Sequence, residues 1–377
     1  MSKNRTQKTR VDFRKNRGNR IRQRPLDSRS LDDDSSAADL ATDERISGKG
    51  GLSRRRTVVT FVDDSSSGGS GIRDVDTSQC LAGLVVSPRG AGCIVRGDNG
   101  RDYDCTVRRV VKTMASSERT AVVAGDRVLL RPDGDQHGVI ERVEPRHGVL
   151  SRKNRKKQHV LAANVDQLLI VMSAVDPPLK PSLVDRYLIS AICGGIRPIV
   201  CINKGDLVDV IELQPIVGLY SQLGYDVAVT SALSGYGVPR LRSLLRARST
   251  AFSGQSGVGK TSLLNSLQPG LGLKTNDVAE ESRKGKHTTT HASLLELSFG
   301  GWVVDTPGIR QFELWDVIPD EVEGYFVEFR PFVATCKFPD CSHTHETGCG
   351  VKRAVDQRLI SVCRYESYLR IRSCETD

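Results

Sequence analysis

A glycine-rich stretch at residues 254–261 has the residue types and spacing of a loop that binds nucleotide phosphates. It consists of a glycine, four further residues and then Gly259-Lys260-Thr261, which is the pattern of such loops. Glycines let backbone N–H groups turn toward the β- and γ-phosphates, Lys260 adds a positive charge, and the Thr261 hydroxyl can coordinate Mg²⁺. We expect nine residues to bind the phosphates: Gly254, Gln255, Ser256, Gly257, Val258, Gly259, Lys260, Thr261 and Ser262.

Two segments earlier in the chain fit the recognition of a guanine base. The first has the spacing N-K-x-D, and the Asp206 carboxylate can accept hydrogen bonds from N1–H and the exocyclic amine of guanine. Adenine lacks these donors and would leave a buried carboxylate unpaired, at a cost of about 1–3 kcal/mol. The second follows the next predicted strand, where a backbone N–H can meet guanine O6. The expected base-binding residues are Asn203, Lys204, Gly205, Asp206, Ser231 and Ala232.

Two segments after the phosphate loop fit binding of the γ-phosphate and Mg²⁺. Asp305 follows an apolar pair, so its carboxylate is expected at a strand end, where it can hold Mg²⁺ through water. The Gly308 N–H can then meet the γ-phosphate, although Asp-Thr-Pro-Gly is also a plausible type I turn. The basic, threonine-rich run at 283–291 predicts the first switch segment, and its spacing does not decide which threonine binds Mg²⁺.

The order of these motifs is itself informative. Ordinary small GTPases carry the phosphate loop first and base recognition last, whereas here the base motifs come first. The sequence therefore predicts a circularly permuted GTPase, in which the chain after Gly308 is attached directly to the second switch. Ile309 stands where many GTPases place a glutamine that orients the attacking water, so slow intrinsic hydrolysis is expected. His287 is the candidate catalytic residue, with a structural or surface histidine as the alternative.

A cluster of thiols and imidazole near the C-terminus predicts a metal site. Three cysteines and a histidine lie within fourteen residues, and the other cysteines are scattered. This ligand set suits tetrahedral Zn²⁺ with no open position, so one structural zinc ion is expected. His345 competes for the histidine position, and a cluster of thiols without metal is the alternative. The predicted ligands are Cys336, Cys341, His343 and Cys349.

Three kinds of segment must position these residues. Five short β-rich runs at about 80–150 predict a small closed barrel of the oligonucleotide-binding type, and an SH3-like barrel would look similar. Strands and helices alternate over 160–320, which predicts an α/β domain with a mostly parallel sheet covered on both faces. A helical zinc module is expected at 325–377, closed by one or two arginine-rich helices.

Composition limits the partners and the location. The formal net charge is +10, which points to a polyanion such as RNA, and no apolar run is long enough to span a membrane. We therefore expect a cytoplasmic protein without a membrane partner. Residues 1–75 are predicted to form a disordered basic and polar tail, whose basic residues would neutralise RNA phosphates or be merely solvated. An organelle transit peptide is a further alternative, disfavoured by Asp32, Asp33 and Asp34. A basic linker is expected at 152–157.

Together, the permuted motifs, the Lys286-His287-Thr288-Thr289-Thr290 run, the preceding barrel and the Cys-Cys-His-Cys cluster resemble the ribosome small-subunit-dependent GTPase A family. The resemblance covers about 80–377. It implies a GTPase that binds GTP and GDP, and that binds the small ribosomal subunit and its rRNA late in maturation. We expect the protein to be a monomer. The resemblance also implies that the four cluster residues bind zinc and that His287 matches the family's proposed catalytic histidine. The alternative is an RNA-binding assembly scaffold that uses GTP only as a conformational ligand; an action on the large subunit is disfavoured by the barrel and the cluster.

Overall fold

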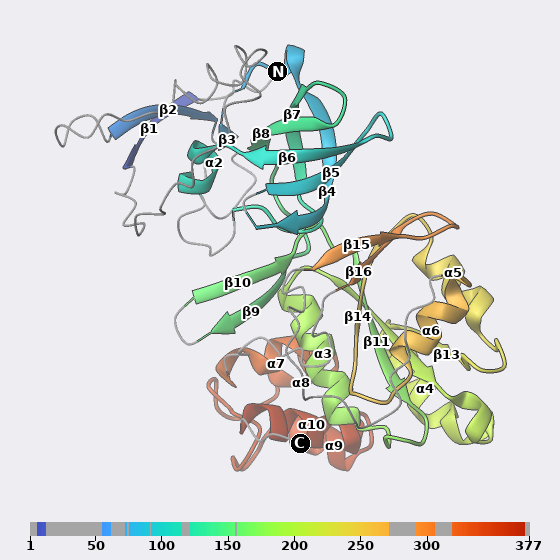
Figure 1. Cartoon of the computed structure of the whole chain (residues 1–377). Helices are drawn as coiled ribbons and strands as arrows, with labels where there is room; N and C mark the ends of the chain where they lie inside the picture. Colours follow the sequence, from blue (N-terminus) through green and yellow to red (C-terminus); the bar gives the residue numbers. More distant parts are fainter. Residues whose placement is uncertain are drawn as a thin grey trace, which may run out of the picture.

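The computed structural model describes residues 6–12, 55–61, 72–73, 75–90, 92–114, 121–154, 157–270, 292–305 and 319–373. These residues form a β-barrel, a six-stranded sheet with helices on both faces, and a C-terminal helical module (Figure 1). The first-switch run at 283–291 and residues 306–318 lie outside the described residues. Among the helices that are described, none is long and apolar enough to cross a bilayer.

The barrel closes in the strand order β4-β5-β6-β8-β7. Its inner side is apolar because alternate residues face inward, as with Cys93 and Val95 on β5 and with Tyr103 and Cys105 on β6. All pairings are antiparallel except β6 with β8. The five predicted strands and the barrel are thus present. They are β4 (Leu81–Arg89), β5 (Gly92–Gly97), β6 (Asp102–Val107), β7 (Arg127–Asp133) and β8 (His137–Val143), accompanied by η2 (Thr77–Gln79) and α2 (Arg109–Met114).

Two segments outside the barrel and the central sheet contain strands that the sequence analysis does not predict. The basic linker is instead an antiparallel hairpin of β9 (Leu150–Asn154) and β10 (Lys157–Ala162), since its buried ends, among them Leu150 and Val160, give it an apolar base. Within the predicted disordered tail, β1 (Thr6–Asp12), β2 (Arg55–Phe61) and β3 (Ile72–Arg73) pair as one sheet. The β-branched run at the centre of β2 favours a strand despite the charged surroundings.

The central sheet has the order β13-β12-β11-β14-β16-β15 and is parallel except for the edge strand β15. All seven residues of β11 are buried, as expected for a strand covered on both sides. One face packs against α3 and α4, and the other against α5 and α6. The strands are β11 (Gln167–Ser173), β12 (Arg197–Asn203), β13 (Asp226–Val229), β14 (Ser249–Ser253), β15 (Ser293–Glu296) and β16 (Trp302–Asp305). The helices are α3 (Pro181–Cys193), η3 (Gly205–Leu207), η4 (Val210–Leu213), α4 (Gln214–Gln222), α5 (Val238–Leu245) and α6 (Lys260–Leu267).

The C-terminal module packs against α3, as the red helices beside the green one show in Figure 1. Its aromatic core includes Phe326, Phe329 and Tyr368, and Ile189 of α3 belongs to the same cluster. A buried ion pair between Arg364 of α10 and Asp185 of α3 crosses the interface. The elements of the module are η6 (Pro319–Glu321), α7 (Val322–Tyr325), η7 (Val327–Phe329), α8 (Arg330–Val333), α9 (Gly350–Asp356) and α10 (Val362–Arg372).

Candidate nucleotide and metal sites

The predicted nucleotide motifs meet at one edge of the sheet. Parallel strands all end at the same edge, and there the chain leaves β12 at Asn203, β14 just before Gly254 and β16 at Asp305. Ligands of open α/β sheets bind outside these carboxyl ends. The topology therefore brings the predicted base-recognition and phosphate-binding segments together although they are far apart in the sequence.

Asn203 connects three of the motifs directly. Its side chain is buried, and Nδ2 donates to the Val258 carbonyl at 2.9 Å. Its Oδ1 accepts from the Ala232 N–H at 3.2 Å and from the Thr230 hydroxyl at 3.3 Å. At Gly259, whose φ is +88°, an added Cβ would lie 2.5 Å from Asn203 Nδ2. Asn203 thus fixes the phosphate loop against the base-recognition segment, and this contact requires glycine in the loop.

The phosphate loop has the glycine-dependent backbone that its sequence predicts. Gly254 and Gly257 both have positive φ, and an added Cβ on Gly254 would lie 2.0 Å from the Val171 carbonyl oxygen. Lys260 Nζ donates to the carbonyls of Gly254 at 2.7 Å and Gln255 at 2.6 Å, which places the ammonium across the loop. Thr261 lies in the first turn of α6, where unpaired N–H groups and the helix dipole favour anions.

The residues predicted to recognise the base flank the phosphate loop. Lys204 adopts a left-handed backbone with φ of +61°, and its Nζ donates to the Asp176 carbonyl at 2.5 Å. The Asp206 side chain is exposed at the same edge. Gly205 is buried, and an added Cβ would lie 2.8 Å from Val229 Cγ1, so a larger residue would require the Val229 side chain to shift. Ser231 accepts the Ser234 N–H at 3.0 Å, which closes the adjoining loop.

Some predicted residues cannot be placed, and some contacts were missed. His287 and Gly308 lie outside the described residues, and of Asp305 only the backbone position at the end of β16 is described. The sequence does not identify the backbone carbonyls of Asp176 and Val258 as hydrogen-bond acceptors for Lys204 and Asn203. Every residue has a backbone carbonyl, so the residue type does not show which one accepts. Gly205, Ser231 and Ala232 are all at the predicted edge.

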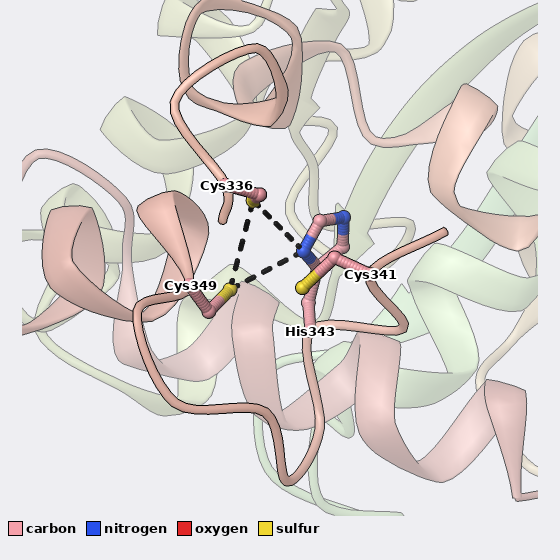
Figure 2. A group of neighbouring side chains, drawn as sticks. All are labelled: Cys336, Cys341, His343 and Cys349. Atoms are coloured by element: carbon pink, nitrogen blue, oxygen red, sulfur yellow. Dashed lines mark hydrogen bonds between the residues drawn. The ribbon is translucent and has the colours of Figure 1, made fainter. Parts of the chain in front are cut away.

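The four predicted metal ligands form one compact cluster, shown in Figure 2. The ligand atoms of Cys336, Cys341, His343 and Cys349 all lie within 4.8 Å of one another. Cys336 Sγ and Cys349 Sγ are 3.9 Å apart, and His343 Nδ1 is 3.3 Å from Cys349 Sγ. Tetrahedral Zn²⁺ with bonds of about 2.3 Å to sulfur separates two sulfurs by about 3.8 Å. The cluster could therefore bind a metal ion such as zinc.

The structure decides between the two candidate histidines. His343 is fully buried within the cluster, whereas the ring of His345 is exposed and its Nδ1 lies 2.9 Å from the Thr344 hydroxyl. Burial, together with neighbouring thiols, raises the pKa of Cys341 to about 12. A bound cation would favour the thiolate that burial disfavours, so metal binding is coupled to proton release.

Comparison with known proteins agrees with this geometry. The model of the RsgA GTPase family matches residues 143–315. A curated protein from Chlorobaculum parvum, the small ribosomal subunit biogenesis GTPase RsgA, is 39% identical over 306 residues, which are 78% of this chain and 98% of that protein. The chain belongs to the RsgA GTPase family. As an RsgA GTPase it is a GTP hydrolase, which confirms the resemblance seen in its motifs.

Two solved structures share the fold over most of the chain. The crystal structure of YjeQ from Thermotoga maritima matches with a TM-score of 0.65 and 34% identity, covering 78% of this chain and 98% of that one. YloQ, described as a circularly permuted GTPase, matches with a TM-score of 0.63 and 28% identity, covering 80% and 96%. The permuted GTPase architecture predicted for this RsgA member is therefore confirmed.

Proposed function

We propose that this chain binds the small ribosomal subunit and hydrolyses GTP to time a late step of subunit maturation or its own release. The observation that carries the proposal is Asn203, whose side chain joins both base-recognition segments to the phosphate loop. The names of its relatives supply the subunit as partner. The net charge of +10 suits binding to rRNA, and a factor acting on assembling subunits works in the cytoplasm.

The roles of the nucleotide-site residues follow from their chemistry. Asp206 selects guanine, Lys204 covers the base, and Ser231 and Ala232 frame its O6. The phosphate loop from Gly254 to Ser262 holds the phosphates with N–H groups and the Lys260 ammonium. Thr261 and Asp305 hold Mg²⁺, which neutralises developing charge on the phosphates when bound. Gly308 meets the γ-phosphate, and His287 positions the attacking water.

The C-terminal module has a structural role in this proposal. One zinc ion is held by three thiolates and His343, a set that leaves no position open for substrate. The barrel and the zinc module then contact rRNA on two sides of the GTPase sheet, and the protein acts as a monomer. Ordering of the switches by GTP, and their release after hydrolysis, changes the affinity for the subunit.

The first test is stimulation by the ribosome. Because Ile309 cannot orient water, the purified chain should hydrolyse GTP slowly, and mature small subunits should raise kcat by more than about tenfold, equivalent to 1.4 kcal/mol of barrier. The measurement is phosphate release in single-turnover and steady-state assays. Large subunits are the control and should leave the rate unchanged. Equal rates with and without small subunits would refute the proposal.

The second test concerns the base. Asp206→Asn replaces a carboxylate, which accepts hydrogen bonds from N1–H and the exocyclic amine of guanine, with an amide. The amide N–H can donate to the carbonyl that xanthine has in place of that amine. We expect the variant to lose GTP affinity by about 10–100-fold, as for loss of a charged hydrogen bond, and to gain affinity for xanthosine triphosphate. Competition binding with GTP and xanthosine triphosphate measures this change in base preference. Asp209→Asn, on the next turn, is the control, and unchanged guanine preference in Asp206→Asn would contradict the assignment.

A further inference from the structure

His343 is held in one orientation within the metal cluster. Its ring packs edge-on to Phe329, with centroids 6.0 Å apart, and lies beside Tyr368 at 6.2 Å. The Tyr365 hydroxyl donates to the His343 carbonyl at 2.7 Å, which supports a residue with a left-handed φ of +57°. This orientation points Nδ1 at the cysteine sulfurs, as Figure 2 shows, so Nδ1 is the atom available to a metal.

The second ring nitrogen of His343 faces a carboxylate. Nε2 is fully buried and makes no well-aligned hydrogen bond with any described residue. The Glu323 oxygen Oε2 nevertheless lies 3.0 Å from it, within hydrogen-bond distance, so a small rotation of either side chain would align the pair. If Nδ1 binds the metal, Nε2 must carry the proton, and a buried N–H without an acceptor is destabilising.

We propose that Glu323 is a positioning residue of the metal site, accepting a hydrogen bond from Nε2–H of His343. This inference rests on the proposal that the cluster binds zinc. The carboxylate fixes the tautomer in which Nδ1 presents its lone pair to the metal, and it holds the ring in this orientation. Metal-bound histidines usually have such a partner, but the motif of ligand residues does not reveal it because Glu323 lies outside the run 336–349.

The location of Glu323 gives this contact a second consequence. It lies on α7, the first α-helix that the structure describes after Asp305. The segment 306–318 between them contains Gly308, which the proposed function places at the γ-phosphate. The contact between His343 and Glu323 therefore links the proposed metal site to α7.

The test compares zinc affinity of the full-length chain and its Glu323 variants. Glu323→Ala should weaken zinc binding about tenfold or more in competition with a chromophoric chelator, as typical for loss of such a partner. Glu323→Gln keeps an acceptor oxygen and should restore most of the affinity. With Co²⁺ in place of zinc, the visible absorption bands of Glu323→Ala should shift, and those of Glu323→Gln should resemble the natural chain. Glu321→Ala, an exposed carboxylate on the preceding turn, is the matched control and should bind zinc normally.

The outcomes separate the inference from the proposal on which it rests. If the natural chain binds no zinc, the metal site itself is wrong. If the natural chain binds one zinc ion, and Glu323→Ala binds it equally tightly with an unchanged Co²⁺ spectrum, the positioning role is refuted. If Glu323→Ala does not fold, Glu323→Leu provides the same test, because leucine is similar in size to glutamate but cannot accept a hydrogen bond.

Discussion

The Lys260→Ala variant will bind GTP about 10–100-fold more weakly than the natural chain and will show no measurable GTP hydrolysis. In the structure, the Lys260 ammonium lies across the loop and donates to the carbonyls of Gly254 and Gln255. A hydrogen bond between a charged donor and a phosphate contributes about 1.5–3 kcal/mol, which corresponds to this range of affinity. The loss in catalysis is larger because charge on the transferring phosphoryl group must be stabilised in the transition state.

The measurement is titration with a fluorescent GTP analogue, followed by phosphate release in the presence of small subunits. Arg246→Ala is the matched control, since it also removes one positive charge but from an exposed position at the end of α5. The control should bind and hydrolyse GTP normally. Retention of natural affinity and rate in Lys260→Ala would show that the loop does not hold the phosphates.

The nucleotide and metal motifs could be predicted because their chemistry depends on residues that are near one another in the chain. The phosphate loop needs glycines at set spacings, and the structure gives Gly254, Gly257 and Gly259 the positive φ that this predicts. Strand β11 was predictable for a similar reason, since a continuous apolar run must be buried on both faces.

Contacts between distant segments could not be predicted in this way. Arg364 was expected to lie on an arginine-rich closing helix, yet its side chain is buried against Asp185, a residue 179 positions earlier. Neither residue is unusual in its local sequence, and only the packing of α10 on α3 makes the pair. The same limit applies to the hairpin β9–β10, because its buried residues Leu150 and Val160 pack against residues from distant parts of the sequence.

The contact with α3 also changes the expected role of the C-terminal module. The motif order predicts that the module follows the second switch directly. The structure adds a second attachment, in which Asp185 accepts from Arg364 and from the Tyr220 hydroxyl at 2.9 Å. Helix α3 follows β11 and precedes β12, the strand that ends at Asn203. The module is therefore anchored to the part of the sheet that carries the predicted base-recognition segment. The C-terminal module is therefore attached to the central sheet through α3 as well as through the chain that precedes it.

The Arg364→Ala variant will be destabilised by about 3–5 kcal/mol, as expected when one partner of a buried ion pair is removed. Arg364 is only 2% exposed, it donates to Glu328 at 2.6 Å, and it stacks 4.3 Å from the Phe326 ring centroid. Its removal leaves Asp185 buried without its counter-charge. Urea denaturation followed by circular dichroism measures the loss. Arg372→Ala, whose partner Asp320 is exposed, is the control on the same helix and should cost less than about 1 kcal/mol.

The pH dependence of this loss identifies its cause. Burial raises the pKa of Asp185, and Arg364 opposes that rise. In Arg364→Ala the pKa of Asp185 in the folded chain will be higher still. Between the pKa of Asp185 in the unfolded chain and its pKa in the folded chain, the folded chain therefore binds more protons than the unfolded chain. Stability of the variant relative to the natural chain should then fall as the pH rises through that range and recover in acid. Adding Asp185→Asn removes the buried charge, and it should abolish the pH dependence and restore part of the lost stability. A loss that is independent of pH, and unchanged by Asp185→Asn, would instead indicate that Arg364 stabilises the interface through packing alone.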